Sequence, residues 1–445
     1  MSEQKVVTRF APSPTGLLHL GAYRTAIFSY LYAKRHKGVF VLRIEDTDKE
    51  RSKKEYEENI IESLKWMGLS YDKFFRQSEH VDIHKNYLEK MIKDGYAFIS
   101  KEEAKDGSGV IKELVRFKNP NIDITFHDAI KGEITINTTD LGDFVIAKNL
   151  NEPLFHLAVV IDDFDAGVTH VIRGEDHTSN TPRQILIQRA IGAPMPVYAH
   201  LPLVLGPDKL KLSKRRGALS ISAYKDMGFL PEAIFNGVAF IGWNPGTEQE
   251  IFTHDELIEV FDLSRVQKSP AVFNEEKLRW FNKEHIKRLP SDQLDKKMIE
   301  WLPESIKNIS GYSEDKYKKI IPIILERITT FGDIKEMVER GELDFFFKQP
   351  EYSKEKLIFK NISVEKITSN LQEAVNKLGE LSEDDFTAEN IKNVLMEIAG
   401  KLESKGELLH PVRFALSGLD KSPDPFIIAE ILGKNETLSR LQKAI

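Results

Sequence analysis

The first 45 residues constrain the fold most, because a strand pattern, a Gly- and Pro-rich loop, a helix pattern and a second strand pattern follow one another there. Residues 6–11 (VVTRFA) and 39–45 (VFVLRIE) have the short apolar runs of buried strands. Between them, apolar residues recur at helical spacing over 22–36. A strand, a crossover helix and a second strand form a βαβ unit, so the two strands are predicted to lie parallel under the helix.

The rest of the chain divides by pattern into an interrupted α/β half and a helical half. Short alternating runs predict a small, mostly β insertion, after which α/β patterns resume at VTHVIR and TPRQILIQRAIG. After about residue 216, apolar residues recur almost wholly at helical spacing. We therefore expect an α/β Rossmann-type domain with a small α+β insertion, followed by all-α C-terminal domains. The predicted bounds are 1–95 and 156–217 for the two Rossmann halves, 96–155 for the insertion, 218–310 for a helical connecting domain, and 311–445 for an all-α region with a break near 380.

Two loops carry groups suited to binding phosphates. In the loop after the first strand, Gly16 and Gly21 flank His19, and the predicted helix begins directly afterwards. Backbone N–H groups and a helix N-terminus can approach an anion closely there. The second loop, KLKLSKRRG at 209–217, is rich in Lys and Arg and suits a polyphosphate whose charge shifts during a reaction. Taken alone, each pattern also has an interpretation without a ligand. The first loop fits a tight turn with a packed histidine, and the second fits a solvent-exposed run of charge.

Together the two loops resemble the ATP-binding elements of class I aminoacyl-tRNA synthetases. Further segments are similar to the glutamyl-tRNA synthetase subgroup over nearly the whole chain: RFAPSPTGLLHLGAYRTA, LRIEDTD, GVTHVIRGEDHTSNTPRQ, LSKRRG, FLPEAIFNGVAFIGW and SPAVFNEEKLRWFN. The helical C-terminal half favours the bacterial glutamyl type. The resemblance implies a ligase that activates L-glutamate with ATP to glutamyl-adenylate and pyrophosphate, then transfers glutamate to the 3′ terminal ribose of tRNA(Glu). It also implies a catalytic Rossmann domain, an insertion that binds the acceptor end of tRNA, and an anticodon-binding C-terminal region.

The resemblance implies four residues that hold the charged groups of glutamate. Arg9 and Arg173 match the positions that bind the side-chain carboxylate, a task that suits a guanidinium fork. Ser13 and Glu45 match the positions that hold the α-amino group. Each arginine ends a predicted strand, at the edge where ligands bind in open α/β sheets. The alternative for each arginine is a structural ion pair.

Two further positions of the amino-acid pocket depart from the family. Phe155 and Val159 stand where the family usually has Tyr and Asn, which normally help to bind the amino-acid side chain. Since Phe155 lacks the hydroxyl, one hydrogen bond to glutamate is missing or comes from another group, such as water.

The resemblance also implies how ATP is bound. Its catalytic residues, which handle the phosphates, are His19, Lys211 and Lys214. Its other ATP-binding positions are Gly16, Gly21, Asp176 and Ser213. Asp176 matches a position near the ribose and alternatively caps the helix near 180. Mg²⁺ is expected with ATP, held mainly by the phosphates. No enzyme nucleophile is needed, because the substrate carboxylate attacks the α-phosphate, so positioning and charge stabilisation supply most of the catalysis.

No structural metal is expected. The chain has no cysteine, which excludes disulfides and thiolate zinc sites. The insertion therefore lacks the cysteines that hold zinc there in many relatives. Asp162, Asp163 and Asp165 follow PLFHLAVVI, which we interpret as a strand. We interpret these three carboxylates as turn caps and not as a metal site.

Composition and charge set the remaining expectations. The hydrophobic fraction of 41% and the charged fraction of 30% are typical of soluble globular proteins. The sequence has no apolar run long enough for a membrane span and no secretory signal pattern at its start. We expect a cytoplasmic monomer. A net charge of -6 still allows tRNA to bind, because phosphate contacts need only a local basic surface.

The sequence disfavours two alternative functions and leaves a third open. A glutaminyl-tRNA synthetase is disfavoured by the helical C-terminal half. A dual-specificity enzyme that charges both tRNA(Glu) and tRNA(Gln) stays open, because discrimination between these tRNAs depends on a few anticodon-facing side chains. A non-catalytic RNA-binding paralogue is disfavoured, because Arg9, His19, Lys211 and Lys214 are all present.

Overall fold

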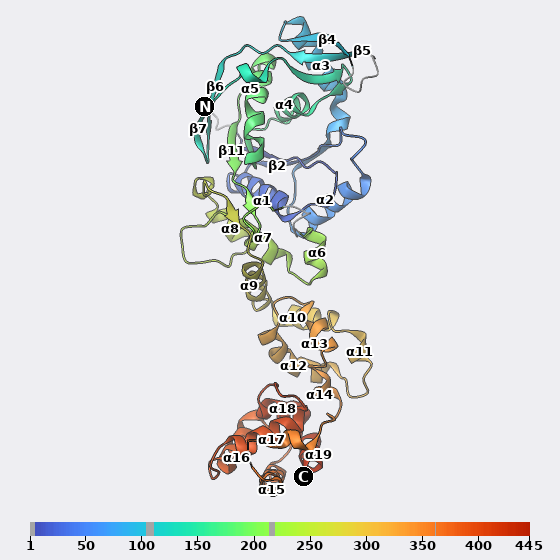
Figure 1. Ribbon diagram of the computed structural model, residues 1–445, viewed down its shortest axis with the longest axis vertical. Helices are drawn as coiled ribbons and strands as arrows, with labels where there is room; N and C mark the ends of the chain where they lie inside the picture. Colours follow the sequence, from blue (N-terminus) through green and yellow to red (C-terminus); the bar gives the residue numbers. More distant parts are fainter. Residues whose placement is uncertain (1–4, 104–110, 213–218, 361) are drawn as a thin grey trace. The chain divides into compact units, whose positions relative to one another are not determined.

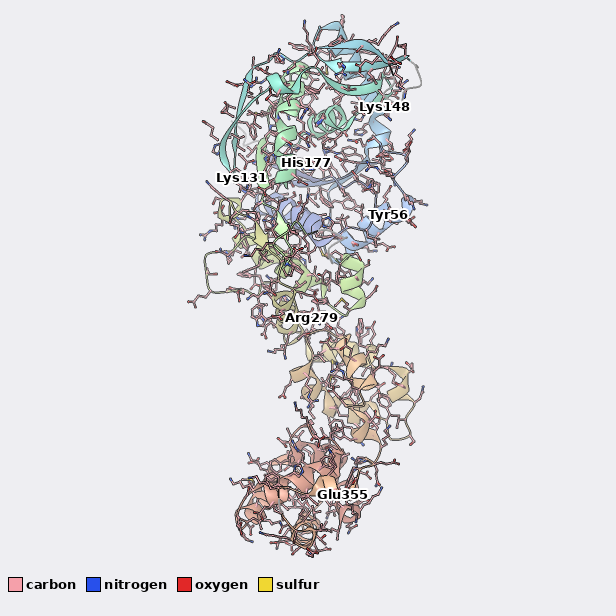
Figure 2. The ribbon with its side chains drawn as sticks, viewed as in Figure 1. Tyr56, Lys131, Lys148, His177, Arg279 and Glu355 are labelled. Carbon is pink, nitrogen blue, oxygen red and sulfur yellow. The ribbon has the colours of Figure 1, made fainter. Side chains whose placement is uncertain are left out.

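The computed structural model describes residues 5–103, 111–212, 219–360 and 362–445. The chain divides into two compact units, Met1–His285 and Ile286–Ile445, and each is described by itself (Figure 1). Figure 2 adds the side chains, with Tyr56 and His177 labelled in unit 1. The finer domain bounds given above remain predictions.

The predicted N-terminal βαβ unit is confirmed. Its strands are β1 (Val7–Phe10) and β2 (Val39–Ile44), which pair in parallel, and its helix is α1 (Leu20–Arg35). Strand β3 (Lys73–Arg76) extends the sheet in parallel beside β2. The helices that follow are α2 (Lys54–Trp66) and α3 (Val81–Lys93). Helix α1 packs in the main core of unit 1, where Tyr23, Ile27 and Leu31 are fully buried.

A second set of parallel strands begins beside β1. This region contains α4 (Phe155–Asp165), β10 (His170–Gly174), α5 (Thr181–Ile191) and β11 (Val197–Leu201). Strands β10 and β11 pair in parallel. Thr169 N–H donates to Val7 O at 2.9 Å, and Val7 N–H donates to Thr169 Oγ1 at 2.8 Å, so β10 starts next to β1. The chain leaves β1 and β10 toward opposite edges of the sheet, and such a switch point opens a ligand crevice at the carboxyl ends of the strands.

The insertion is divided between two sheets, a feature that the sequence did not predict. Its strands are β4 (Ala97–Glu103), β5 (Ile111–Phe117), β6 (Asp123–Asp128), β7 (Gly132–Asn137), β8 (Phe144–Asn149) and β9 (Glu152–Pro153). Strands β4, β5, β8 and β9 form an antiparallel sheet. The β6–β7 hairpin instead joins β11, through Asp128 opposite Tyr198. One hairpin of the insertion is therefore continuous with the sheet of β10 and β11.

Three predicted elements of unit 1 are wrong. PLFHLAVVIDD forms helix α4 and not a strand, because residues 157–163 are all buried and therefore lack the polar face that reveals a helix. The helical periodicity of residues 222–240 predicts one helix, but the structure has two, α6 (Ile221–Asp226) and α7 (Pro231–Ala239), separated by Gly228 at φ 80°. The apolar run VYAHLPLVL predicts one strand, but β11 ends at Leu201, and β12 (Val204–Leu205) is a separate strand that pairs with β13 (Ala271–Val272).

The last helices that begin in unit 1 are α8 (His254–Val260) and α9 (Glu275–Ile286), and the division between the units falls at the end of α9. Unit 2 confirms the all-α prediction for the C-terminal region, since its described residues contain helices and no strand. Its helices are α10 (Ser291–Glu300), α11 (Glu304–Lys307), α12 (Glu314–Arg327), α13 (Asp333–Glu339), α14 (Asp344–Phe347), α15 (Val364–Gly379), α16 (Ala388–Ala399), α17 (Gly406–Ser417), α18 (Pro425–Leu432) and α19 (Lys434–Ala444). No helix in the described part of the chain is both long and apolar enough to span a bilayer.

Candidate active site

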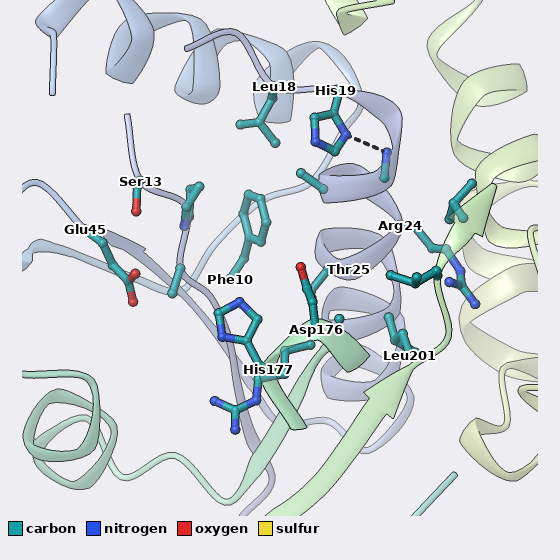
Figure 3. Close-up of a pocket in the computed structure, with 18 of the residues that line it drawn as sticks. Phe10, Ser13, Leu18, His19, Arg24, Thr25, Glu45, Asp176, His177 and Leu201 are labelled. Carbon is teal, nitrogen blue, oxygen red and sulfur yellow. Dashed lines mark hydrogen bonds between the residues drawn. The ribbon is translucent and has the colours of Figure 1, made fainter. Parts of the chain in front are cut away.

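A cavity of about 390 Å³ opens at the carboxyl ends of β1 and β10. Every predicted site residue that the structure describes lines it: Arg9, Ser13, Gly16, His19, Gly21, Glu45, Phe155, Val159, Arg173, Asp176 and Lys211. The predicted residues Ser213 and Lys214 lie outside the described residues. Figure 3 shows Ser13 and Glu45 at one end of the cavity and Arg24 at the other. Residues that are far apart in sequence thus share one site.

Ser13 and Glu45 lie at the same end of the cavity because a hydrogen bond joins the loop after β1 to the end of β2. The backbone N–H of Glu45, directly after β2, donates to Pro12 O at 3.0 Å. This bond places the Pro-rich loop after β1 against the end of β2. Burial raises the pKa of Glu45 above its ordinary value, and the neighbouring Arg43 opposes that shift. An ammonium group bound here would add a further cation and favour the Glu45 carboxylate.

A buried chain of alternating charges connects Arg9 to Glu45. Arg9 Nε lies 3.3 Å from Asp163, Asp163 Oδ1 lies 2.5 Å from Arg43 Nη1, and Arg43 Nη2 lies 3.0 Å from Glu45 Oε1. Arg9 Nη1 also donates to Ile172 O at 3.2 Å. Within the described residues, Arg9 Nη2 has no hydrogen-bond partner, although Arg9 lines the cavity. The ion pair expected as the alternative role of Arg9 is therefore present, and it leaves one nitrogen for a ligand.

The interpretation of Asp162 and Asp163 as turn caps is wrong. Both are buried in α4, and Asp163 is the anion between Arg9 and Arg43. Asp162 accepts from Gln77 Nε2 at 2.7 Å and lies 2.7 Å from His84 Nε2. Burial alone would raise the pKa of Asp163, but Arg9 and Arg43 lower it below its ordinary value. Only Asp165 is exposed.

Arg173 is a buried cation whose hydrogen-bond partners are all neutral. Only 6% of its surface is exposed, and burial lowers its pKa to about 10. Its three nitrogens donate to His200 Nε2 at 3.1 Å, to Gln184 Oε1 at 2.7 Å and to Thr181 Oγ1 at 2.9 Å. No carboxylate of the described residues accepts a hydrogen bond from it. A buried charge without a counter-ion is costly, so an anionic ligand in the cavity would stabilise Arg173.

His19 and Gly21 form the turn into α1. His19 is the N-cap of this helix, and its Nδ1 accepts from Gly21 N–H at 3.1 Å (Figure 3). A neutral His19 therefore carries its proton on Nε2, where it can donate to an oxyanion. A Cβ added at Gly21 would lie 3.1 Å from the His19 ring, which explains why glycine suits this position. The Gly21 N–H itself is occupied by His19.

Asp176 and Lys211 form an exposed ion pair over the cavity. Lys211 Nζ lies 2.8 Å from Asp176 Oδ2, with 56% and 48% of the two side chains exposed. The capping alternative for Asp176 is not seen, because Asn180 is the N-cap of α5 and no side chain caps that helix. A Cβ at Gly174 would lie 2.5 Å from Asp176 Oδ1, so the missing side chain makes room for this carboxylate.

Phe155 and Val159 form an apolar wall at the start of α4. They lie one helical turn apart, and the Phe155 ring centre is 5.7 Å from that of His177. The sequence reasoning missed His177, which lines the cavity and whose pKa burial lowers to about 4. It also missed Arg43. A charged residue inside the otherwise apolar strand VFVLRI was the signal for Arg43, and the adjacent motif residues were the signal for His177.

No group of three or more potential ligand side chains within the described ranges is arranged to hold a metal ion. The cavity offers cations and N–H donors on the side of His19 and Lys211, and a paired carboxylate at Asp176. Such a lining suits a nucleotide whose metal ion is carried by its phosphates.

Comparisons with known proteins agree with this geometry. A family model described as tRNA synthetases class I (E and Q), catalytic domain, matches residues 5–106 and 99–280, and an anticodon binding domain model matches 293–445. A glutamate–tRNA ligase of Aquifex aeolicus is 43% identical, with 99% of each chain covered. One from a Sulfurihydrogenibium species is 40% identical, with 98% of each covered. A crystal structure of a glutamate tRNA ligase from Elizabethkingia meningosepticum, in complex with its amino acid, has a TM-score of 0.88 and 34% identity, covering 99% of both chains.

The parallel sheet, the cavity at its switch point and the matched catalytic domain define a class I aminoacyl-tRNA synthetase, an ATP-using ligase. The helical unit that follows carries the anticodon-binding match. By identity over its full length, the chain belongs to the bacterial glutamate–tRNA ligase family.

Proposed function

We propose that this synthetase activates L-glutamate with ATP and transfers it to the 3′ terminal ribose of tRNA(Glu). The observation that carries the proposal is Arg173, a buried guanidinium in the cavity whose hydrogen-bond partners among the described residues are all neutral. The names of the curated relatives and of the solved neighbours point to the same substrate. Nothing among these relatives favours charging of tRNA(Gln).

The end of the cavity lined by Arg9, Glu45 and Arg173 offers charges opposite to those of the side-chain carboxylate and the α-ammonium group of glutamate. Arg173 and the open Nη2 of Arg9 offer two guanidinium groups for the side-chain carboxylate. Glu45, with Ser13 beside it, offers an anion and a hydroxyl for the α-ammonium group. Phe155 and Val159 exclude water along the aliphatic part of the side chain.

The other end of the cavity fits ATP, taken as its Mg²⁺ complex. We assign the phosphates to His19 and Lys211, together with the N-terminus of α1, with Gly16 in the loop before it. Lys214 and Ser213 complete this assignment, and Asp176 is assigned to the ribose. The glutamate α-carboxylate attacks the α-phosphorus, the bond to the β-phosphate oxygen breaks, and pyrophosphate leaves. The terminal ribose hydroxyl of tRNA then displaces AMP from the adenylate. The cations stabilise the charge that develops on the phosphate oxygens.

Exchange of labelled pyrophosphate into ATP tests this function. With L-glutamate and tRNA(Glu) present, we expect exchange well above background, and with L-glutamine we expect little. We further expect exchange to need tRNA, as is known for glutamyl-type enzymes. An enzyme that exchanges faster with another amino acid, or with none, would refute the assignment of the pocket.

Lys211→Ala should slow exchange more than it weakens glutamate binding. In the resting site Lys211 is paired with Asp176 and exposed, so it can move to the phosphates at little cost. We expect loss of about 2 kcal/mol of transition-state stabilisation, roughly thirtyfold in kcat. Lys209→Ala is the matched control, since Lys209 belongs to the same basic loop but does not line the cavity. Equal effects of the two variants would show that only the net charge of the loop matters.

Binding of tRNA should weaken steeply with salt. The chain is acidic overall, with a net charge of -6, so it must present local basic surfaces to the phosphates. We expect the affinity for tRNA(Glu) to fall about a hundredfold between about 50 and about 200 mM salt. Fluorescence anisotropy with labelled tRNA measures this slope, and a flat salt dependence would contradict phosphate-dominated binding. We also propose that the enzyme acts as a monomer in the cytoplasm.

A further inference from the structure

A buried pair, Asp128 and His200, contacts Arg173 through His200. His200 lies on β11, next to β10, and is opposite Arg173 in the strand register. Its Nδ1 is 2.6 Å from Asp128 Oδ2, and its Nε2 accepts from Arg173 Nε at 3.1 Å. Both Asp128 and His200 are fully buried.

The chemistry of the partners fixes the proton on His200. A guanidinium can only donate hydrogen bonds, so His200 Nε2 must be an acceptor. A carboxylate can only accept them, so the ring proton sits on Nδ1 and is donated to Asp128. Burial lowers the pKa of His200, which keeps the ring neutral at neutral pH. Thr181 Oγ1 also lies 3.2 Å from Nε2, but a proton on Nε2 would aim an N–H at Arg173 Nε, which is itself a donor.

Asp128 is itself held rigidly by the insertion. It ends β6, and its Oδ1 accepts from the backbone N–H groups of Ile130 at 2.9 Å and Lys131 at 2.8 Å. Its Oδ2 also accepts from His200 N–H at 3.0 Å. Lys131, labelled in Figure 2, fixes the same turn to Glu175 through a 2.5 Å ion pair. Every contact that the structure gives this carboxylate is from a donor.

We propose that Asp128 and His200 are positioning residues for amino-acid recognition: the β6–β7 hairpin, through Asp128 and the Nδ1-protonated His200, sets the direction in which Arg173 presents its guanidinium to the substrate carboxylate. This inference rests on the proposed function, because it takes Arg173 as the ligand of the glutamate side chain. It assigns a part in the amino-acid pocket to the strands of the insertion, β4 to β9, although none of their residues lines the cavity.

Asp128→Asn tests the direction of the hydrogen bonds with little change in shape. The amide must turn its NH2 toward either the turn or His200, and all the groups it faces there are donors. We expect the KM for glutamate in tRNA-dependent exchange to rise about tenfold, with the KM for ATP nearly unchanged. The control is Asp123→Asn, which changes an exposed carboxylate at the other end of β6 and should leave both constants as in the wild type.

Two variants of His200 separate positioning from packing. His200→Gln keeps an acceptor for Arg173, whereas His200→Phe keeps the ring that stacks on Tyr198 with centres 5.9 Å apart. Positioning predicts a glutamate KM within about threefold of wild type for Gln and about tenfold higher for Phe. The reverse order, or an unchanged KM in Asp128→Asn, would overturn the proposal.

A measurement on the substrate-free protein tests the proposal without any enzyme assay. In a sample with ¹⁵N-labelled histidine, long-range ¹H–¹⁵N spectra report which ring nitrogen carries the proton. We expect one signal set with Nδ1 protonated and Nε2 an acceptor, and it should vanish in His200→Gln. A proton on Nε2 of His200 would overturn the proposal even if the enzyme charges glutamate. Conversely, a wild type that fails to exchange with glutamate would refute the proposed function and leave this measurement valid.

Discussion

Replacing Arg173 with alanine is expected to raise the KM for glutamate about 150-fold, which corresponds to about 3 kcal/mol, while the KM for ATP changes little. The reason is that Arg173 is buried, and its partners are His200, Gln184 and Thr181, so its charge is left for the ligand. The variant should also narrow the preference for glutamate over glutamine, because a guanidinium fork favours a carboxylate over an amide that presents an NH2 group.

Arg189→Ala provides the matched control for this experiment. Arg189 lies on α5, the helix whose N-terminal part holds Arg173, but its side chain is exposed and does not line the cavity. Steady-state exchange with glutamate and glutamine as alternative substrates gives the constants for both variants. If Arg173→Ala kept a normal KM and a normal preference, Arg173 would be a structural residue and the pocket would be assigned wrongly.

The second large effect is expected for stability. Asp163 is the buried anion between Arg9 and Arg43, and its removal leaves Arg9 without a carboxylate partner among the described residues. We expect Asp163→Ala to lower the free energy of unfolding of unit 1 by about 3–5 kcal/mol. The loss should be largest at neutral pH. Because Arg9 and Arg43 lower the pKa of the folded Asp163, its contribution is present above the ordinary pKa of an aspartate and disappears as the pH falls through the lowered value.

Urea unfolding measures this loss if fluorescence reports unit 1 alone. Of the four tryptophans in the chain, only Trp301 belongs to unit 2, so a Trp301→Phe background leaves Trp66, Trp243 and Trp280 as probes of unit 1. Asp165→Ala is the control, because Asp165 is an exposed aspartate at the end of the same helix. An Asp163→Ala midpoint equal to that of Asp165→Ala would show that the Arg9–Asp163–Arg43 network contributes nothing to folding.

Local pattern was enough to predict the elements that have one polar face. Helices α2, α3, α12 and α16 each have an exposed side, so their periodicity is visible in the sequence. Helix α4 was mistaken for a strand because it is buried on all sides. The union of β6 with β11 is a contact between distant segments, and no local pattern encodes it.

The candidate site also divides into residues that the sequence predicted and residues that it did not. Motif similarity led to residues that line one cavity, from Arg9 at the end of β1 to Lys211 in the basic loop. The residues behind them were missed or misread: Arg43 and Asp163 looked like a strand residue and a turn cap, and Asp128 and His200 carried no motif. Their roles depend on pairs that form only when the sheet is assembled.

Charging of two purified tRNAs shows which amino acid and which tRNA the enzyme joins. The wild-type enzyme is incubated with ATP, Mg²⁺, labelled L-glutamate and either tRNA(Glu) or tRNA(Gln), and acid-insoluble label is counted. We expect glutamate on tRNA(Glu), none on tRNA(Gln), and no charging of either tRNA with labelled glutamine. Charging of both tRNAs with glutamate would establish the dual-specificity alternative, and absence of label on tRNA(Glu) would contradict the proposed function.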